Sequence, residues 1–201
     1  MNKLLKGSIA GAVGVALLLG GAGTFASWNN SAIVGSAGAI KAGTLTVTDP
    51  APTTAGVWRN GPLASSPIIG TIANFRTVPG DTLTYTKNMT VTATGDNLKA
   101  SLALDPTTIV ASSGSTPADV ALAGFLASGA AITATGTGVN PALDSSNVVI
   151  PGVYSIAPSA TAVTVSVVVT LKFPNGAAAA ENGAKVGSVN LSNLAVLLTQ
   201  N

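Results

Sequence analysis

The stretch Thr82–Ala93, TLTYTKNMTVTA, alternates two kinds of side chain along its whole length. Successive side chains of a β-strand point to opposite faces of a sheet, so a period of two predicts a strand with one buried face. The prospective core face carries Leu83, Tyr85, Lys87, Met89, Val91 and Ala93. The opposite face carries Thr82, Thr84, Thr86, Asn88, Thr90 and Thr92. A helix has a period of 3.6 and would scatter both sets, so this stretch commits the chain to a β-fold.

Shorter segments extend the pattern. Ala42–Val47 and Leu98–Leu104 alternate in the same way, and Ile68–Ile72 predicts a short strand. Ala162–Phe173 is the most continuous β-branched run, which is typical of a central strand. Val186–Thr199 closes the chain with Val189, Leu191, Leu194, Val196 and Leu198 available for the core, and a bulge near Ser192-Asn193 would reconcile their change of parity.

One helix interrupts the strands. Thr116 can cap the free N–H groups of a helix start, Pro117 suits the first helical position, and Asp119 suits the positive end of the helix dipole. Val120, Leu122, Ala123, Phe125 and Leu126 then form an apolar stripe, and Gly129 ends it before a strand over Ala130–Thr135. We interpret this as a helix that covers a sheet; a binding helix is the alternative.

Two stretches predict irregular structure. Asp49–Pro67 contains four prolines and two glycines and predicts a surface excursion, within which Trp58 would pin the loop onto the core or stack on a ligand. Gly136–Asn147 predicts a loop, followed by a brief strand over Val148–Ile150. About eight strands and a single helix predict an all-β, antiparallel β-sandwich.

The N-terminus has the pattern of an export signal. Lys3 and Lys6 precede an apolar run, and the small residues Thr24 and Ala26 stand where a processing enzyme requires them. Residues 1–26 are therefore predicted to be a signal peptide, cleaved between Ala26 and Ser27. The alternative is an uncleaved anchor helix, which the cluster of glycines at residues 20–23 disfavours.

Composition narrows the possible functions. Of nine basic residues, Lys3 and Lys6 belong to the predicted signal, so the processed chain is formally neutral against its seven acidic residues. We therefore expect no nucleic-acid partner. Charged residues make up only 8% of the chain, and weak self-repulsion favours association. The chain has no cysteine and no histidine, which removes disulfides, thiolate metal sites and the commonest general base.

The residues around the predicted cleavage site resemble a known family. Gly21, Gly23, Thr24, Phe25, Ala26, Trp28 and Asn29, followed by Ala42, Gly43, Thr44, Leu45 and Val47, are similar to the TasA/camelysin family of exported biofilm-fibre proteins. The Pro79-Gly80-Asp81 turn with the hairpin after it, and the short capped helix that leads into a strand, resemble the same family. The insertion at Asp49–Pro67 departs from its pattern.

This resemblance implies a jelly-roll form of the sandwich and a secreted structural protein of a Gram-positive bacterium. It also implies processing by a dedicated signal peptidase and self-assembly into filaments of a biofilm matrix or surface fibre, with an accessory anchoring or nucleating protein as a further partner. We divide the chain accordingly into the signal peptide at 1–26, an N-terminal arm at 27–40 and a β-sandwich domain at 41–201.

The arm is the predicted self-assembly element. It is too apolar for a solvated tail and too rich in glycine for a helix. In the fibre proteins the segment freed by processing enters the sheet of the next subunit, and the resemblance implies the same here. We expect Trp28 to be the anchor, with Ile33, Val34 and Ile40 as further contacts. The alternative is that the arm packs on its own domain as an edge strand.

Two other function classes were weighed. A monomeric cell-surface adhesin or binding module would use exposed aromatic residues, of which Trp28, Trp58, Tyr85 and Tyr154 are the candidates. Camelysin-like relatives are described as metalloproteases, but this chain lacks H-E-x-x-H, a G-x-S-x-G elbow and a phosphate-binding glycine loop. Its seven carboxylates are scattered singly. We therefore expect no enzymatic activity, no catalytic or metal-binding residues and no cofactor.

Overall fold

The larger of two sheets is built around two long antiparallel strands, β4 (Thr82–Thr94) and β10 (Val163–Lys172). The computed structural model describes residues 41–50, 56–112 and 115–201, which belong to one compact unit. β10 pairs with β4 along its entire length. The other strands of this six-stranded sheet are β7 (Ala130–Gly136) beside β10, β1 (Thr44–Thr48) and β2 (Val57–Asn60) beside β4, and β3 (Ile68–Ile69) beside β2.

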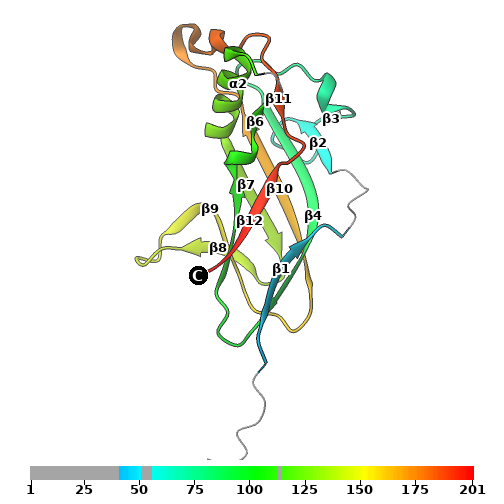
Figure 1. The fold of residues 1–201 in the computed structure, drawn as a ribbon, viewed down its shortest axis with the longest axis vertical. Coiled ribbons are helices and arrows are strands. Elements are labelled where there is room, and N and C mark those ends of the chain that lie inside the picture. Colours follow the sequence, from blue (N-terminus) through cyan, green and yellow to red (C-terminus); the bar gives the residue numbers. More distant parts are fainter. Residues whose placement is uncertain (1–40, 51–55, 113–114) are drawn as a thin grey trace, which may run out of the picture. The chain divides into compact units, whose positions relative to one another are not determined.

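The second sheet has four strands in the order β12-β5-β9-β8, and Figure 1 shows it alongside the first. Its members are β5 (Ala100–Asp105), β8 (Val139–Leu143), β9 (Val149–Ile156) and β12 (Ala195–Gln200). A separate pair joins β6 (Val110–Ala111) to β11 (Val189–Asn190). The helices are α2 (Pro117–Ser128) and the 3-10 segments Ile72–Asn74, Pro106–Thr108 and Ala177–Ala184.

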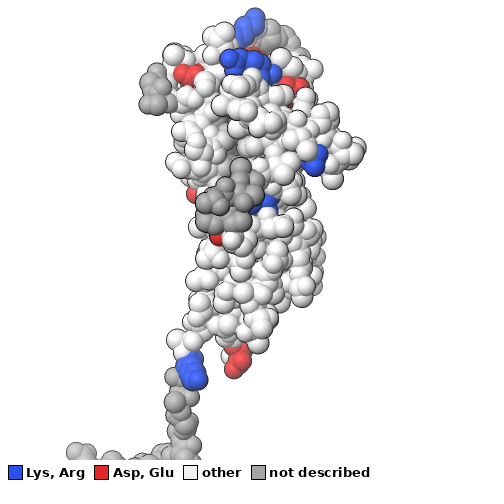
Figure 2. All heavy atoms as spheres, turned by 90° about the vertical axis from the view of Figure 1, so that its right-hand side faces the viewer, with Lys and Arg blue, Asp and Glu red and all other residues white. Residues whose placement is uncertain are grey.

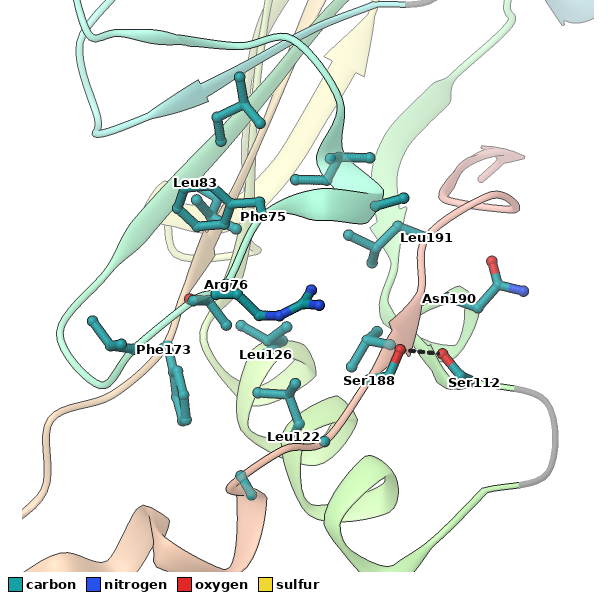
Figure 3. Close-up of a pocket in the computed structure, with 18 of the residues that line it drawn as sticks. Phe75, Arg76, Leu83, Ser112, Leu122, Leu126, Phe173, Ser188, Asn190 and Leu191 are labelled. Carbon is teal, nitrogen blue, oxygen red and sulfur yellow. Dashed lines mark hydrogen bonds between the residues drawn. The ribbon is translucent and has the colours of Figure 1, made fainter.

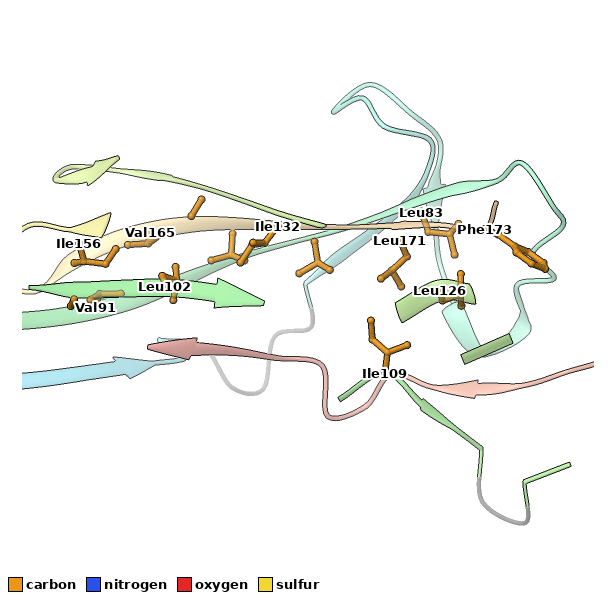
Figure 4. Close-up of a cluster of buried hydrophobic side chains, with 14 of the residues drawn as sticks. Leu83, Val91, Leu102, Ile109, Leu126, Ile132, Ile156, Val165, Leu171 and Phe173 are labelled. Atoms are coloured by element: carbon orange, nitrogen blue, oxygen red, sulfur yellow. The ribbon is translucent and has the colours of Figure 1, made fainter. Parts of the chain in front are cut away.

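One hydrophobic core serves both sheets. Val91 of β4, Val165 of β10 and Leu102 of β5 have no measurable exposure and belong to a single contiguous cluster. Figure 4 shows this cluster running lengthwise between the strands and ending at Leu126 and Phe173. The described chain is therefore an all-β fold with antiparallel pairing and, within those residues, one α-helix, as its alternation predicts.

The strongest sequence signals are confirmed. Leu83, Val91 and Ala93 of β4 are buried, and β10 lies between β4 and β7 as a central strand. The helix begins at Pro117 with Thr116 as its cap, and Gly129 ends it. Its inner face is Leu122, Ala123 and Leu126, whereas Val120, predicted as part of the stripe, is 58% exposed.

Three weaker predictions are wrong. The segment Gly136–Asn147 is not a loop, because Gly138 adopts a φ of +75° that reverses the chain at once and lets β8 pair with β9. The excursion Asp49–Pro67 contains strand β2, which pairs with β4. The expected bulge at Ser192-Asn193 is a complete break, because β11 and β12 pair in different sheets.

The shared core makes a direct prediction about stability. Leu102→Ala should lower the free energy of unfolding by about 2–5 kcal/mol, because it removes a fully buried side chain and leaves a cavity between the sheets. Leu63→Ala is the control, since Leu63 is 64% exposed and its loss should change the free energy by no more than about 0.5 kcal/mol. Urea unfolding followed by circular dichroism measures both. Equal effects would contradict a core shared by the two sheets.

Candidate functional site

An open groove of about 1630 Å³, lined by both apolar and polar side chains, lies at the end of the sheets where β4 begins. Figure 3 shows its walls converging from four parts of the chain: the loop before β4, the helix α2, the segment after β10 and the β11 strand. Its apolar lining includes the side chains of Ile72, Phe75, Leu122, Leu126, Leu191 and Leu194. All of these belong to the core cluster or pack against it, so the groove is an opening in the core.

The groove exists because the two sheets are bordered by different elements at this end. On the side of the larger sheet, β2, β3 and the Ile72–Asn74 turn border it, and on the other side β11 and the Leu191–Leu194 turn do. No hydrogen bond between these two borders is present in the described residues. At the opposite end of β4, β1 contacts β12 and the sheets come together. The space between the two sheets is therefore closed at the end of β4 where β1 pairs, and open at the end where β4 begins.

An aromatic pair forms one corner of the groove. The rings of Trp58 and Tyr85 lie 4.8 Å apart between centroids, and Tyr85 Oη accepts a hydrogen bond from Gly56 N at 3.0 Å. Both side chains are half-buried. Trp58 thus holds β2 on the core, which is the first of the two roles predicted for it from the sequence. None of the described aromatic side chains is exposed, so the described surface offers no aromatic platform for a sugar ring.

A buried aspartate fixes the wall opposite. Asp119 accepts hydrogen bonds from Thr116 N at 2.7 Å and Thr116 Oγ1 at 2.9 Å, which completes a capping box at the start of α2. Its other oxygen accepts from Ser188 N at 2.6 Å, just before β11. Backbone hydrogen bonds from Thr116 and Ser188 hold the pKa of this carboxyl below its usual value of 3.8. One side chain therefore joins the helix to the strand that borders the groove.

The corner just before Ser188 is tightly built and strained. A Cβ atom at Gly187 would lie 2.4 Å from the carbonyl oxygen of Ala118, so only glycine fits there. Val186 has a φ of +58° and is fully exposed. A β-branched residue is rarely found in this left-handed region, and such strain clusters at binding surfaces. Val186 and Gly187 both line the groove.

Charges are sparse at the groove. Figure 3 shows the Arg76 side chain extending into it toward Leu191, and Lys185 stands at its rim. The buried Glu181 accepts a hydrogen bond from Gly176 N. Lys87 forms an ion pair with Asp49 outside the groove. Figure 2 shows acidic and basic side chains side by side at this end of the surface.

The two edge strands of the four-stranded sheet, β12 and β8, differ in how their outer edges are protected from pairing with another strand. Within the described residues β12 pairs with β5 alone, so its outer edge is unpaired. It contains neither proline nor charge, and Leu197 on its outer face is 57% exposed. By contrast, Pro141 lies within the edge strand β8 and removes a backbone donor there. An edge without such protection is open to pairing with another strand.

The carboxylates show no catalytic arrangement in the described residues. Asp81 accepts from Val78 N, Asp105 from Thr107 N, and Asp144 from Ser146 N and Val148 N, so each holds a turn. No group of three or more His, Cys, Asp and Glu side chains there could hold a metal ion. No described helix has the length and hydropathy needed to cross a membrane.

The predicted processing and assembly residues lie outside the described residues. These are Ala26, Ser27, Trp28, Ile33, Val34 and Ile40. The sequence interpretation does not predict the groove, because its lining combines segments that lie more than a hundred residues apart in the chain. Leu191 and Leu194 were predicted as core residues, and nothing in their spacing distinguishes the rim of an opening from a closed core.

Comparison with protein-family models, with curated proteins and with solved structures finds no match to this chain. The geometry of the groove therefore stands by itself as the basis for a functional proposal.

The Asp119 bridge predicts an acid-sensitive groove wall. The hydrogen bonds of the folded protein favour the ionised carboxylate of Asp119. Its contribution to the free energy of unfolding is therefore complete above pH 3.8, the ordinary pKa, and is lost as the pH falls through the lower pKa of the folded state. Asp119→Asn should destabilise the protein at neutral pH and flatten the loss of stability in acid. Thermal unfolding from neutral pH down to about pH 2 measures this. Asp96→Asn, in the exposed turn at the other end of β4, is the control; an unchanged acid profile for Asp119→Asn would contradict the bridge.

Proposed function

We propose that this chain is a secreted structural protein that assembles head to tail into extracellular filaments. In this proposal the arm Ser27–Ile40 of one subunit enters the groove of the next and adds a strand beside β12. The observation that carries the proposal is the combination of an open groove with an unpaired strand edge, that of β12, which begins directly after the groove residue Leu194. Backbone hydrogen bonds along the edge would supply affinity, and side chains in the groove would supply register.

The chemistry of the arm suits this groove. Ser27–Ile40 carries no charged residue, and its large side chains are Trp28, Ile33, Val34 and Ile40. The groove offers apolar side chains from α2 and from the β11–β12 connection, of which Leu191 and Leu194 stand nearest to the unpaired edge of β12. Burying an aromatic and three aliphatic side chains contributes about 1.5–3 kcal/mol each before ordering costs.

The positions of the two partners in one subunit favour contact between subunits. Thr44, the first residue of β1, pairs with Thr94, the last residue of β4. The groove is bordered by Leu83 and Tyr85 at the first residues of β4. β4 has thirteen residues, which separates the two ends by roughly 40 Å. β1 runs toward the groove, so its first residue, Thr44, lies at the end of β4 that is far from the groove.

This arrangement is heterologous: one end of a subunit would bind the other end of its neighbour. A head-to-tail contact that does not close into a ring propagates as a filament. Processing between Ala26 and Ser27 by a dedicated signal peptidase would act as the switch, since an arm still attached to its signal cannot dock. An accessory protein would then anchor or nucleate the filament at the cell surface.

The jelly-roll topology and the family resemblance belong to the same proposal. The chain crosses repeatedly between the two sheets, from β4 to β5, from β7 to β8 and from β9 to β10, as Greek-key sandwiches do. This supports a jelly-roll relative of the TasA/camelysin fibre proteins. The low charge of the surface, visible in Figure 2, is compatible with dense packing of copies.

Removal of the arm tests the proposal first. The processed chain Ser27–Asn201 should form filaments in negative-stain electron microscopy, and deletion of Ser27–Gly38 should leave a soluble monomer in size-exclusion chromatography. The deletion removes the inserted strand and leaves every described core residue in place. Filaments from the deleted chain would refute the role of the arm.

A peptide experiment tests the groove. A labelled synthetic peptide of Ser27–Ile40 should bind the arm-deleted protein, and Leu191→Glu should weaken that binding by at least about tenfold, because a carboxylate replaces an apolar side chain of the lining and the arm has no charge to pair with it. Val120→Glu, at an exposed position of α2 that does not line the groove, is the matched control and should bind normally. Fluorescence anisotropy gives the affinities, and a scrambled peptide checks specificity. Equal binding by both variants would place the arm elsewhere.

A further inference from the structure

The direction of β12 relative to the groove is fixed by its two ends. The strand begins directly after Leu194, which lines the groove. Its last residue, Gln200, lines a small cavity at the opposite end of the fold, together with Thr44 and Thr94. β12 therefore runs away from the groove. β1 runs the other way, because its first residue, Thr44, pairs with the last residue of β4.

An arm from a neighbouring copy meets β12 in one direction. Subunits joined head to tail keep the same polarity, so Thr44 of the neighbour faces the groove end of this subunit. The arm that precedes it then continues into the groove, with Ile40 nearest to the mouth and Ser27 deepest. From N to C the arm runs out of the groove, whereas β12 runs away from the mouth into the subunit. The direction of the arm thus rests on the proposed function, and it is antiparallel to β12.

An arm that packs on its own domain runs in the opposite direction. It leaves Thr44 at the end of β4 far from the groove and has to fold back to reach β12 of the same chain. Ser27 would then lie nearer to the groove than Ile40, which makes the arm parallel to β12. Strand direction therefore distinguishes insertion into a neighbour from an edge strand within one subunit.

The side chains of β12 divide between two faces of the sheet. Val196 and Leu198 are half-buried and pack against the core. Ala195, Leu197 and Thr199 point to the outer face and are exposed. Among these three, only Leu197 is a large apolar side chain, and it is 57% exposed. The outer face of this unpaired edge strand thus has one aliphatic side chain in water.

The arm divides in a matching way when its residues alternate as in a strand. Its even-numbered positions include Trp28, Val34 and Ile40, which form the apolar face that suits the space between the sheets. Its odd-numbered positions are serine, asparagine, glycine or alanine, except for Ile33. The outer face of the arm therefore also carries one large aliphatic side chain. Residues opposite each other on paired strands share a face, so the two outer aliphatic side chains can meet.

We propose that the arm pairs antiparallel to β12 of the next copy, with Ile33 beside Leu197 on the outer face. Side chains directly opposite on antiparallel strands have Cβ atoms about 4.5–5.5 Å apart, so these two cover each other from water. The pair gives the exposed Leu197 an apolar partner and sets the register of the inserted strand. In this register Ser31 lies beside Thr199, because residue numbers rise along one strand as they fall along the other.

Paired cysteines test the register, because the chain has no cysteine of its own. Under mild oxidation, the processed Ile33→Cys/Leu197→Cys chain should give a ladder of disulfide-linked chains on a denaturing gel, since each copy links to a neighbour on either side. Ile33→Cys/Val149→Cys is the matched control, because Val149 is 52% exposed and lies on β9. The control should link at least about tenfold more slowly, since no contact raises its effective concentration. Equal rates would overturn the pairing.

A second set of variants measures strand direction. Ser31→Cys/Thr199→Cys joins positions that the antiparallel pair brings together. Ser31→Cys/Ala195→Cys joins positions that a parallel pair with the same central contact would bring together. All three positions lie on the outer faces of their strands, so the substitutions leave the core intact. We expect the ladder from the Thr199 variant, and a ladder from the Ala195 variant instead would overturn the antiparallel direction.

Electron microscopy of the same samples separates this pairing from the proposed filament. Filaments without a ladder from Ile33→Cys/Leu197→Cys would overturn the pairing and leave the filament standing. A disulfide within single chains, seen as a faster monomer band, would show an arm packed on its own domain and overturn both. Neither filaments nor linked chains from variants that circular dichroism shows to be folded would likewise overturn both.

Discussion

The antiparallel pairing of β4 with β10 is the interaction on which the rest of the fold depends. Ten consecutive residues of β10 find partners on β4, and the inward side chains of both strands, among them Val91, Val165 and Leu171, form the floor of the core. β1, β2 and β7 pair directly with one of these two, and β3 joins the sheet through β2. The smaller sheet and α2 then cover the apolar face that the pair presents, because an uncovered face of this size would leave the core in water.

The groove follows from how the edge of β4 is used. β1 pairs with its last residues and β2 with its first residues, so the two short strands share one edge and border different stretches of the opening between the sheets. β1 contacts β12, which closes the space between the sheets at that end. β2 and β3 instead border the groove, whose other border is the short strand β11 and the Leu191–Leu194 turn. Because the chain supplies no strand to fill this stretch in the described residues, one end of the core stays open. The proposed role of the arm is to complete that core from another subunit.

Local signals in the sequence predicted the elements whose structure is determined locally. The alternation of Thr82–Ala93 and the β-branched run of β10 are strong because each is long enough to exclude a helix, and the Thr116–Asp119 cap is a four-residue motif. β8 was missed because Pro141 argues against a strand, although a proline is tolerated at an edge where no donor is needed. Asp119 was predicted as a helix-start residue, but its bond to Ser188 spans sixty-nine residues and depends on the fold. The groove is likewise a property of assembled elements, so no sequence window contains it.

The central claim is that the edge of β12 receives a strand from another copy of the chain. Amide hydrogen exchange measures this most directly, because an unpaired edge amide exchanges quickly and a paired one is protected. The comparison is between the processed chain under assembling conditions and the chain without Ser27–Gly38. The account predicts new protection in Ala195–Gln200 of the processed chain, with the central strand β10 protected equally in both. Equal, fast exchange of Ala195–Gln200 in the two proteins would contradict it.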